Sequence, residues 1–223
     1  MDLKSLHNEG LFTPTYNHFA LLLRKLEKAQ IIKSYRHPLN RKKYVYLTRK
    51  GDEQFIAEHN RTQIDDKSLF HDLLVSEISR SFKNLVWINE AELEHTFKNK
   101  RSFSDSTQVI PDARFYIRKR FSLLSIAFEL ELTQKEKTRI EEKAKQYIIN
   151  SQYDFVLYYF TKPTVADTYR KIIKEIYSGK KYKKFLFVVD MNPVRSNKDW
   201  RELEIIHKDS KVPLAEFFES LHQ

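Results

Sequence analysis

Residues 121–132 read FSLLSIAFELEL, an apolar strand-like run that ends in two carboxylates, Glu129 and Glu131. The preceding stretch, 109–118, reads as a neighbouring strand and contains Pro111-Asp112. Helical periodicity then alternates with apolar runs, and the expected elements are helices at 134–149 and 164–178 and strands at 153–160 and 184–190. This alternation is typical of an α/β fold, here with a mixed central sheet flanked by helices.

The same domain extends in both directions from these strands. Its outer elements are expected to be a helix at 69–82, a strand at 85–88, a short helix at Ile205-Ile206 and a last helix near 213–221. Asn60 to Ser68 is polar and reads as a linker. We therefore expect two domains, at residues 1–62 and 68–223.

The N-terminal segment reads as a helix, a basic hairpin and a second helix. In order along the chain, we expect a helix at 14–29, strands at 31–35 and 44–48, and a helix at 49–60. Phe19, Leu22, Leu23 and Leu26 form one apolar stripe on the first helix. This order matches a winged helix from its recognition helix onward, but only about a dozen residues precede that helix. The unit is therefore truncated, or a partner completes it, and a homodimer is one way to do so.

Basic residues are concentrated in this segment. Ten Lys and Arg residues and one acidic residue, Glu27, lie between Arg24 and Lys50, and the whole chain has a formal net charge of +10. The shared charge of helix and hairpin favours double-stranded DNA as the partner, over a merely solvated hairpin or an anionic membrane surface. The residues expected to contact DNA are Tyr16, Asn17 and Arg24 in the major groove, and Arg41, Lys42 and Lys43 at the backbone or minor groove.

Composition excludes several other kinds of site. The chain has no Cys, which excludes disulfides, thiolate zinc sites and a cysteine nucleophile. It has only 3 Gly and no glycine-rich phosphate-binding motif. No apolar run approaches the roughly 20 residues that span a bilayer, and the first residues lack the apolar core of a signal peptide. We therefore expect a cytoplasmic protein that does not insert into a membrane.

The two glutamates of the 121–132 strand are expected to point to the same face, because side chains alternate along a strand. Two carboxylates on one face of an apolar strand repel each other and lose solvation unless a positive charge compensates them. With Asp112 on the adjacent strand, the pattern predicts a site for Mg²⁺ or Mn²⁺, which prefer oxygen ligands. Such an ion activates water and stabilises charge on a phosphate during displacement. The alternative is that lysines pair with these carboxylates.

Helices contribute two further candidates to this site. Lys143 falls at the edge of the apolar stripe formed by Ile140, Ala144 and Tyr147, from which it can reach a phosphate or an attacking water. Glu77 lies inside the apolar stripe of the 69–82 helix, where a charged residue is rare. It is either a catalytic or metal-site residue or part of a structural ion pair. Tyrosines expected near the site are Tyr147, Tyr158 and Tyr159.

The residues PDARF at 111–115 and AFELEL at 127–132 resemble the P-D…(D/E)-x-K signature of restriction-endonuclease-like nucleases. Glu131 departs from that signature, which has lysine at this position. Some restriction enzymes also have E-x-E, and several relatives carry the lysine on the following helix, where Lys143 lies. Over nearly the whole chain, LLLRKLEKAQIIKSY, KKYVYLTRKG and HDLLVSEI resemble the replication-relaxation family of plasmid and mobile-element proteins, most closely its MOBC-class conjugative relaxases.

The resemblance implies a plasmid mobilisation relaxase that nicks DNA at a transfer origin with Mg²⁺ or Mn²⁺. It implies Asp112, Glu129 and Glu131 as catalytic metal-binding acids, with Lys143 beside them. The implied partners are the plasmid origin, other relaxosome proteins and a coupling protein. The alternative, favoured by the missing x-K lysine, is a DNA-binding replication or regulatory protein with a catalytically idle nuclease fold.

Overall fold

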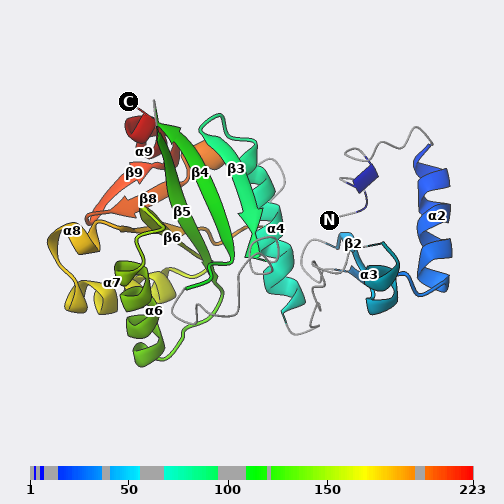
Figure 1. Ribbon diagram of the computed structural model, residues 1–223, viewed down its shortest axis with the longest axis horizontal. Coiled ribbons are helices and arrows are strands. Elements are labelled where there is room, and N and C mark those ends of the chain that lie inside the picture. The colour runs from blue at the N-terminus through cyan, green and yellow to red at the C-terminus, as the bar shows by residue number, and fades with distance from the viewer. Residues whose placement is uncertain are drawn as a thin grey trace. The chain divides into compact units, whose positions relative to one another are not determined.

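The computed structural model describes residues 3, 6–7, 15–36, 41–55, 68–94, 109–119, 122–193 and 199–222. The chain divides into two compact units, Met1–Leu73 and Leu74–Gln223. The boundary lies within helix α4 (Leu69–Lys83), and residues 60–67 of the expected linker lie outside the described residues. Figure 1 shows the helices and strands of both units, coloured from blue to red along the chain.

The N-terminal unit contains a helix, a hairpin and a short helix. These are α2 (Tyr16–Lys28), β1 (Ile32–Arg36), β2 (Lys43–Leu47) and α3 (Arg49–Phe55). The two strands are antiparallel, with Ile32 opposite Leu47 and Arg36 opposite Lys43. Residues 37–40 of the expected basic turn and 56–60 of the expected second helix lie outside the described residues.

One face of α2 forms the core of this unit. Phe19 and Leu23 are buried with Ile32 of β1, and Leu26 packs against them. The expectation that Leu22 belongs to this stripe is wrong, because its side chain is 40% exposed. Leu22 lies about 100° around the helix from Leu23, at the margin of the face that the buried residues share. The buried stripe of α2 is therefore narrower than the sequence indicates.

Gly51 allows α3 to pack closely against Ile31, the residue directly before β1. A Cβ atom at this position would lie 2.1 Å from the carbonyl oxygen of Ile31. The contact is held by Thr48, whose amide donates to Ile31 O at 2.9 Å and whose hydroxyl accepts from the Gly51 amide at 3.2 Å. A larger residue at Gly51 must separate the helix from the hairpin.

A seven-stranded sheet forms the centre of the second unit. Its strands are β3 (Ile88–Leu93), β4 (Ala113–Lys119), β5 (Ser122–Glu131), β6 (Phe155–Phe160), β7 (Phe185–Val189), β8 (Glu204–His207) and β9 (Ser210–Pro213). They lie side by side in the order of the sequence. The β5–β6 and β6–β7 pairs are parallel, and the other pairs are antiparallel. The expectation of an α/β unit with a mixed sheet is confirmed.

Helices cover both faces of this sheet (Figure 1). On one face lie α6 (Lys137–Ile149), α7 (Pro163–Ile176) and α8 (Gly179–Tyr182), which share a core cluster with Ala127, Tyr158 and Phe187 of the strands. On the other face, Phe82 of α4 contacts the rings of Phe115 and Phe128. The last helix, α9 (Leu214–His222), packs there through its own aromatic residues. No helix in the described part of the chain has the length and apolar character needed to cross a membrane.

Two short elements differ from the sequence-based expectation. The strand expected at 85–88 is a turn, in which the Leu85 and Ile88 amides donate to Phe82 O and Leu85 O, and β3 begins only at Ile88. The helix expected at Ile205-Ile206 is strand β8, where Ile205 lies opposite Val188 of β7. Both runs are short and apolar, and such runs do not distinguish a strand from a helix or a buried turn.

Replacing Gly51 with alanine should destabilise the N-terminal unit by at least about 1–3 kcal/mol, because the new methyl group meets backbone rather than a movable side chain. Helix propensity alone predicts the opposite sign, since alanine is favoured over glycine by about 1 kcal/mol in a helix. Hydrogen exchange of the β1 and β2 amides in Gly51→Ala measures the effect, with the exposed Gln54→Ala on the same helix as the control. Unchanged exchange rates would contradict the close approach seen here.

Candidate active site

Glu129 and Glu131 lie at the end of β5, on the face that α6 and α7 cover. Ala127, two positions earlier, belongs to the core cluster of that face. Both carboxylates are deeply buried, with exposed fractions of 1% for Glu129 and 5% for Glu131. Because β5 is central in the sheet and parallel to β6, Glu129 also lies beside Tyr158 and Glu131 beside Phe160. The strand therefore places two acids within an aromatic core.

Helix α6 supplies two partners to Glu129. Lys143 Nζ donates to Glu129 Oε2 at 2.5 Å, and the Tyr147 hydroxyl donates to Glu129 Oε1. The two residues are four positions apart and therefore share one face of the helix. Tyr147 is fully buried, whereas the side chain of Lys143 is 30% exposed at the edge of the helix. Both oxygens of Glu129 thus have a donor from the same helix.

Two tyrosine hydroxyls near these acids have no hydrogen-bond partner in the described part of the chain. They belong to Tyr158 of β6 and Tyr169 of α7, both buried. The Tyr169 hydroxyl nevertheless interacts with Glu131, and this interaction lowers the pKa of that carboxyl. Buried hydroxyls normally find a partner, so the Tyr158 hydroxyl is an unsatisfied donor close to the carboxylates.

Asp112 approaches the site from the neighbouring strand. It immediately precedes β4, and its Oδ2 accepts a hydrogen bond of 2.8 Å from the Leu130 amide, between the two glutamates. Its own amide donates to Phe128 O at 3.0 Å. Asp112 raises the pKa of both Glu129 and Glu131 by charge repulsion. The antiparallel pairing of β4 with β5 thus brings a third acid to the same end of β5.

Burial is the main influence on the pKa of the two glutamates. It raises the pKa of Glu129 to about 8, against the opposing effects of Lys143 and Tyr147. It also raises the pKa of Glu131, although Lys143 acts to lower it. For Lys143, burial lowers the pKa, but Glu129, Asp112 and Glu131 together raise it above the usual value. The three acids therefore keep Lys143 charged, and the ionised form of Glu129 depends on Lys143 and Tyr147 to offset its burial.

The donor types of this site suit a hard divalent cation, because all three acids offer oxygen ligands. Their arrangement is that of a protein-internal ion pair. In the described residues, no group of three or more His, Cys, Asp or Glu side chains is arranged to hold a metal ion. At Glu129, the Lys143 ammonium contacts Oε2, so this oxygen is already paired within the protein.

Glu77 lies away from this group. It is half-buried on α4, and α4 covers the face of the sheet that carries Phe115 and Phe128. Side chains alternate along β5, so Phe128 and Glu129 point to opposite faces. The structure thus brings Asp112, Glu129, Glu131 and Lys143 together and leaves Glu77 on the other side. Tyr159 also faces that side, where its hydroxyl donates to Asp190.

The candidate DNA-contacting residues differ in their solvent exposure and in whether they form ion pairs. Tyr16, Asn17 and Arg24 are exposed on α2, and Arg41 and Lys42 are exposed just before β2. Lys43 is different, because its Nζ forms an ion pair of 3.0 Å with Glu27 of α2, with both side chains partly buried. Lys43 therefore joins the hairpin to the helix.

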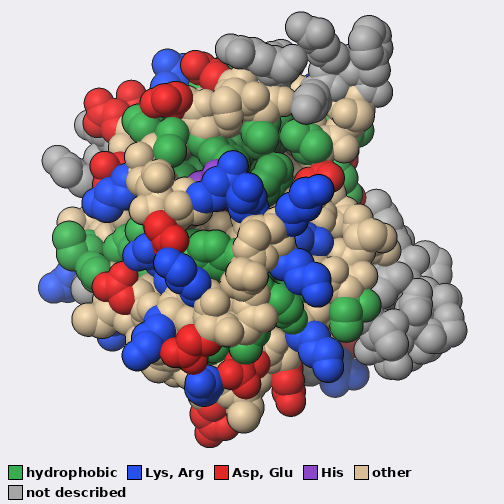
Figure 2. Space-filling view, turned by 90° about the vertical axis from the view of Figure 1, so that its left-hand side faces the viewer, with side chains coloured by type: hydrophobic (Ala, Val, Ile, Leu, Met, Phe, Trp, Pro, Cys, Tyr) green, Lys and Arg blue, Asp and Glu red, His purple; other side chains and the backbone are tan. Residues whose placement is uncertain are grey.

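The second unit spreads its basic residues over its surface. Figure 2 shows one face on which Lys and Arg side chains lie among acidic and apolar ones, with no single continuous basic patch. Several are paired, as in Lys174–Asp209 at 2.7 Å and Arg170–Asp209 at 3.3 Å. This face by itself does not indicate a nucleic-acid surface.

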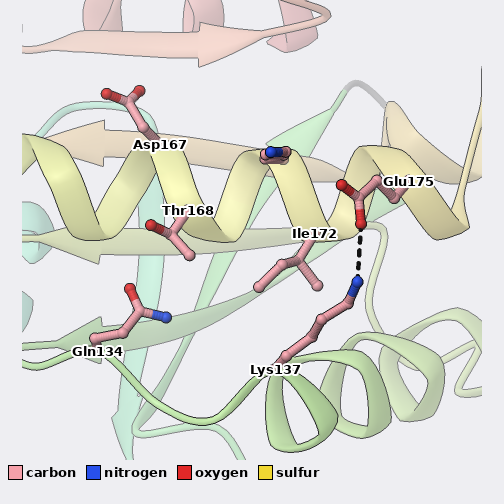
Figure 3. Close-up of a pocket in the computed structure, with 7 residues that line it drawn as sticks. Gln134, Lys137, Asp167, Thr168, Ile172 and Glu175 are labelled. Carbon is pink, nitrogen blue, oxygen red and sulfur yellow. Dashed lines mark hydrogen bonds and ion pairs between the residues drawn. The ribbon is translucent and has the colours of Figure 1, made fainter.

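A hollow between α6 and α7 lies on the outer side of these helices (Figure 3). Thr168 and Ile172 point from α7 toward Gln134 and Lys137, and Lys137 Nζ contacts Glu175 at 3.0 Å. None of the candidate catalytic residues lines it. The hollow is therefore separate from the carboxylate site.

Two tyrosine contacts were not expected from the sequence. Tyr147 was expected in the core and near the site but not as a donor to Glu129, and Tyr169 was not singled out. The spacing of Val165, Tyr169 and Ile172 marks a buried helix face and carries no sign of a polar partner. Their roles depend on which helix packs over β5.

Metal-free protein should lose stability as the pH rises from about 4.5 to about 8. The folded pKa of Glu129 is raised from 4.5 to about 8, so in this window the folded state binds a proton that the unfolded state has released. Stability then falls by up to about 1.4 kcal/mol per pH unit. Denaturant unfolding of wild type and Glu129→Gln in a chelator, at pH 5.5 and pH 8, should show that the amide removes this part of the pH dependence. The exposed Glu142→Gln on α6 is the control, and equal pH dependence in wild type and Glu129→Gln would refute the assignment.

No protein-family model matches the chain, and no curated protein matches it in sequence. The buried carboxylates, Lys143 and the unpartnered tyrosine hydroxyls are thus the observations from which its function has to be inferred.

Proposed function

We propose that this protein is a DNA-nicking endonuclease that uses Mg²⁺ or Mn²⁺. In this proposal the N-terminal unit is a winged-helix module and the second unit a restriction-endonuclease-like domain. The observation that carries it is the buried Glu129, held by Lys143 and flanked by Glu131 and Asp112 at one end of β5. The likeness of the PDARF and FELEL segments to nuclease motifs supports the narrower proposal of a relaxase acting at a plasmid transfer origin.

The acids, the lysine and the tyrosine of the site have different tasks in this reaction. The carboxylates of Asp112, Glu129 and Glu131 would supply the oxygens that hold the ion. When bound, the ion would activate a water and stabilise the charge on the phosphate. The Lys143 ammonium would contact the phosphate. It would act there as a compact positive charge. The hydroxyl of Tyr158, which has no partner among the described residues, would donate to water held beside the acids.

The exposed basic residues of the N-terminal unit support a role in holding double-stranded DNA. Arg24 on α2 and Arg41 at the hairpin are on the surface, and a winged helix uses these two elements to contact the duplex. Contacts of this kind to phosphates position the DNA and carry no sequence information themselves. The catalytic unit would then receive DNA that is already bound.

A second candidate function is a DNA-binding protein of a mobile element whose nuclease fold is idle. Two observations favour it: Glu131 stands where the nuclease signature has lysine, and Lys143 forms an ion pair with Glu129. In that case the carboxylates are structural, and activity resides only in DNA binding.

Nicking of supercoiled DNA that carries the element's own origin distinguishes the two candidates. Wild type with Mn²⁺ or Mg²⁺ should convert it to open circles, and Asp112→Asn and Glu129→Gln should reduce the rate by at least about a hundredfold, a loss typical of removing one charge-stabilising group. Asp112→Asn keeps an oxygen for the Leu130 amide, so its loss of activity reports charge and not folding.

The exposed Glu142→Gln, on the same helix as Lys143, is the control and should nick like wild type. If wild type binds the origin and no preparation nicks it, the idle-fold function replaces the nuclease proposal.

DNA binding by the N-terminal unit should depend steeply on salt. Replacing Arg24 and Arg41 together with alanine should weaken binding and reduce the slope of log K against log salt by about two, one unit for each lost phosphate contact. Fluorescence anisotropy with a labelled duplex measures the slope. Lys211→Ala, which removes a lysine paired with Glu204 in the other unit, is the control. An unchanged slope in the double variant would place DNA binding elsewhere.

A further inference from the structure

When Glu129 is ionised, its charge is balanced by an internal cation. Lys143 Nζ lies 2.5 Å from Glu129 Oε2, and the Tyr147 hydroxyl contacts the other oxygen. Glu129 is 1% exposed, so water does not compensate its charge. A metal ion that uses Glu129 as a ligand must therefore displace one of these two donors.

The two donors differ in how readily they can leave. Tyr147 is fully buried and packs against the ring of Tyr153, with centroids 5.9 Å apart. Lys143 has a flexible stem at the edge of α6, and its side chain is 30% exposed. A lysine at such an edge can turn its ammonium toward solvent while its stem stays packed. The exchangeable oxygen is thus Oε2, and the exchangeable donor is Lys143.

We propose that Lys143 is a resident counter-ion of Glu129, which a divalent cation displaces, and that this displacement delivers the ammonium to the phosphate of the bound DNA. The inference rests on the proposed function: as the described residues stand, no group of three or more His, Cys, Asp or Glu side chains could hold a metal ion, and displacement of Lys143 would free one oxygen of Glu129. In the ion-free protein the lysine lowers the repulsion among Asp112, Glu129 and Glu131. Once the ion supplies that charge, Lys143 becomes available.

This exchange links two binding events. An ion that must displace Lys143 binds more weakly than it would to the same acids without the lysine. A phosphate that binds the released ammonium stabilises the displaced state, so DNA and the ion should each increase the affinity for the other. The metal ion and the released Lys143 ammonium would thereby act together only when both the ion and DNA are bound.

Wild-type protein allows a direct test by amine labelling. An N-hydroxysuccinimide acetate pulse, followed by mass spectrometry, measures the reactivity of each lysine with and without Mn²⁺. Lys143 should react several-fold faster with Mn²⁺, because its amine leaves the ion pair. Lys145 is the internal control, since it is exposed on the same helix and should not change. Equal or slower labelling of Lys143 in saturating Mn²⁺ would overturn the inference.

A second test measures binding of Mn²⁺ alone by calorimetry. Lys143→Met should bind Mn²⁺ about tenfold more tightly than wild type, within the usual range of coupling between two sites, and Lys145→Met should bind like wild type. If wild type binds Mn²⁺ and Lys143→Met binds it equally or more weakly, the counter-ion role is wrong and the metal site stands. If neither wild type nor Lys143→Met binds Mn²⁺, the metal site of the proposed function fails together with the inference.

Discussion

The structure of the second unit depends on keeping one carboxylate, Glu129, inside an aromatic core. Leaving such a group without a partner costs about 3–5 kcal/mol, so the chain must bring a cation and a donor to it. Lys143 and Tyr147 do this from adjacent turns of α6. Their contacts fix the rotation of α6 about its axis and its position along β5. The same contacts that neutralise Glu129 therefore also determine how α6 packs on the sheet.

The topology of the sheet explains why three acids meet at the end of β5. This strand pairs antiparallel with β4 and parallel with β6, so it joins the two halves of the mixed sheet. The antiparallel partner begins where β5 ends, which brings Asp112 to the Leu130 amide. The parallel connection leads through α6, which crosses the face that carries Glu129 and Glu131. One strand end thus receives an acid from one side and a cation from the other.

Much of this arrangement follows from periodicity in the sequence, but not the parts that depend on distant contacts. Alternation placed Glu129 and Glu131 on one face, and helical spacing placed Lys143 at an edge of α6. The side of the sheet that α4 covers is a matter of tertiary packing, and it separates Glu77 from the acids. The β8–β9 hairpin was missed because its turn, Lys208-Asp209, has positive φ at both residues without the usual Asn or Gly. Arg170 and Lys174 of α7 form ion pairs with Asp209 of this turn.

The energetic cost of the site bears on which function it serves. A buried ion pair is seldom more stable than apolar residues of the same volume, so three clustered acids are a poor way to hold α6 against β5. A purely structural network would also use the hydroxyl of Tyr158, yet no described residue accepts a hydrogen bond from it. Both features have a simple explanation if the arrangement exists to bind something that the chain itself does not provide. A cation with its water molecules matches the charge of the acids and the donors left over, and this is why a metal-dependent reaction is preferred over a structural role.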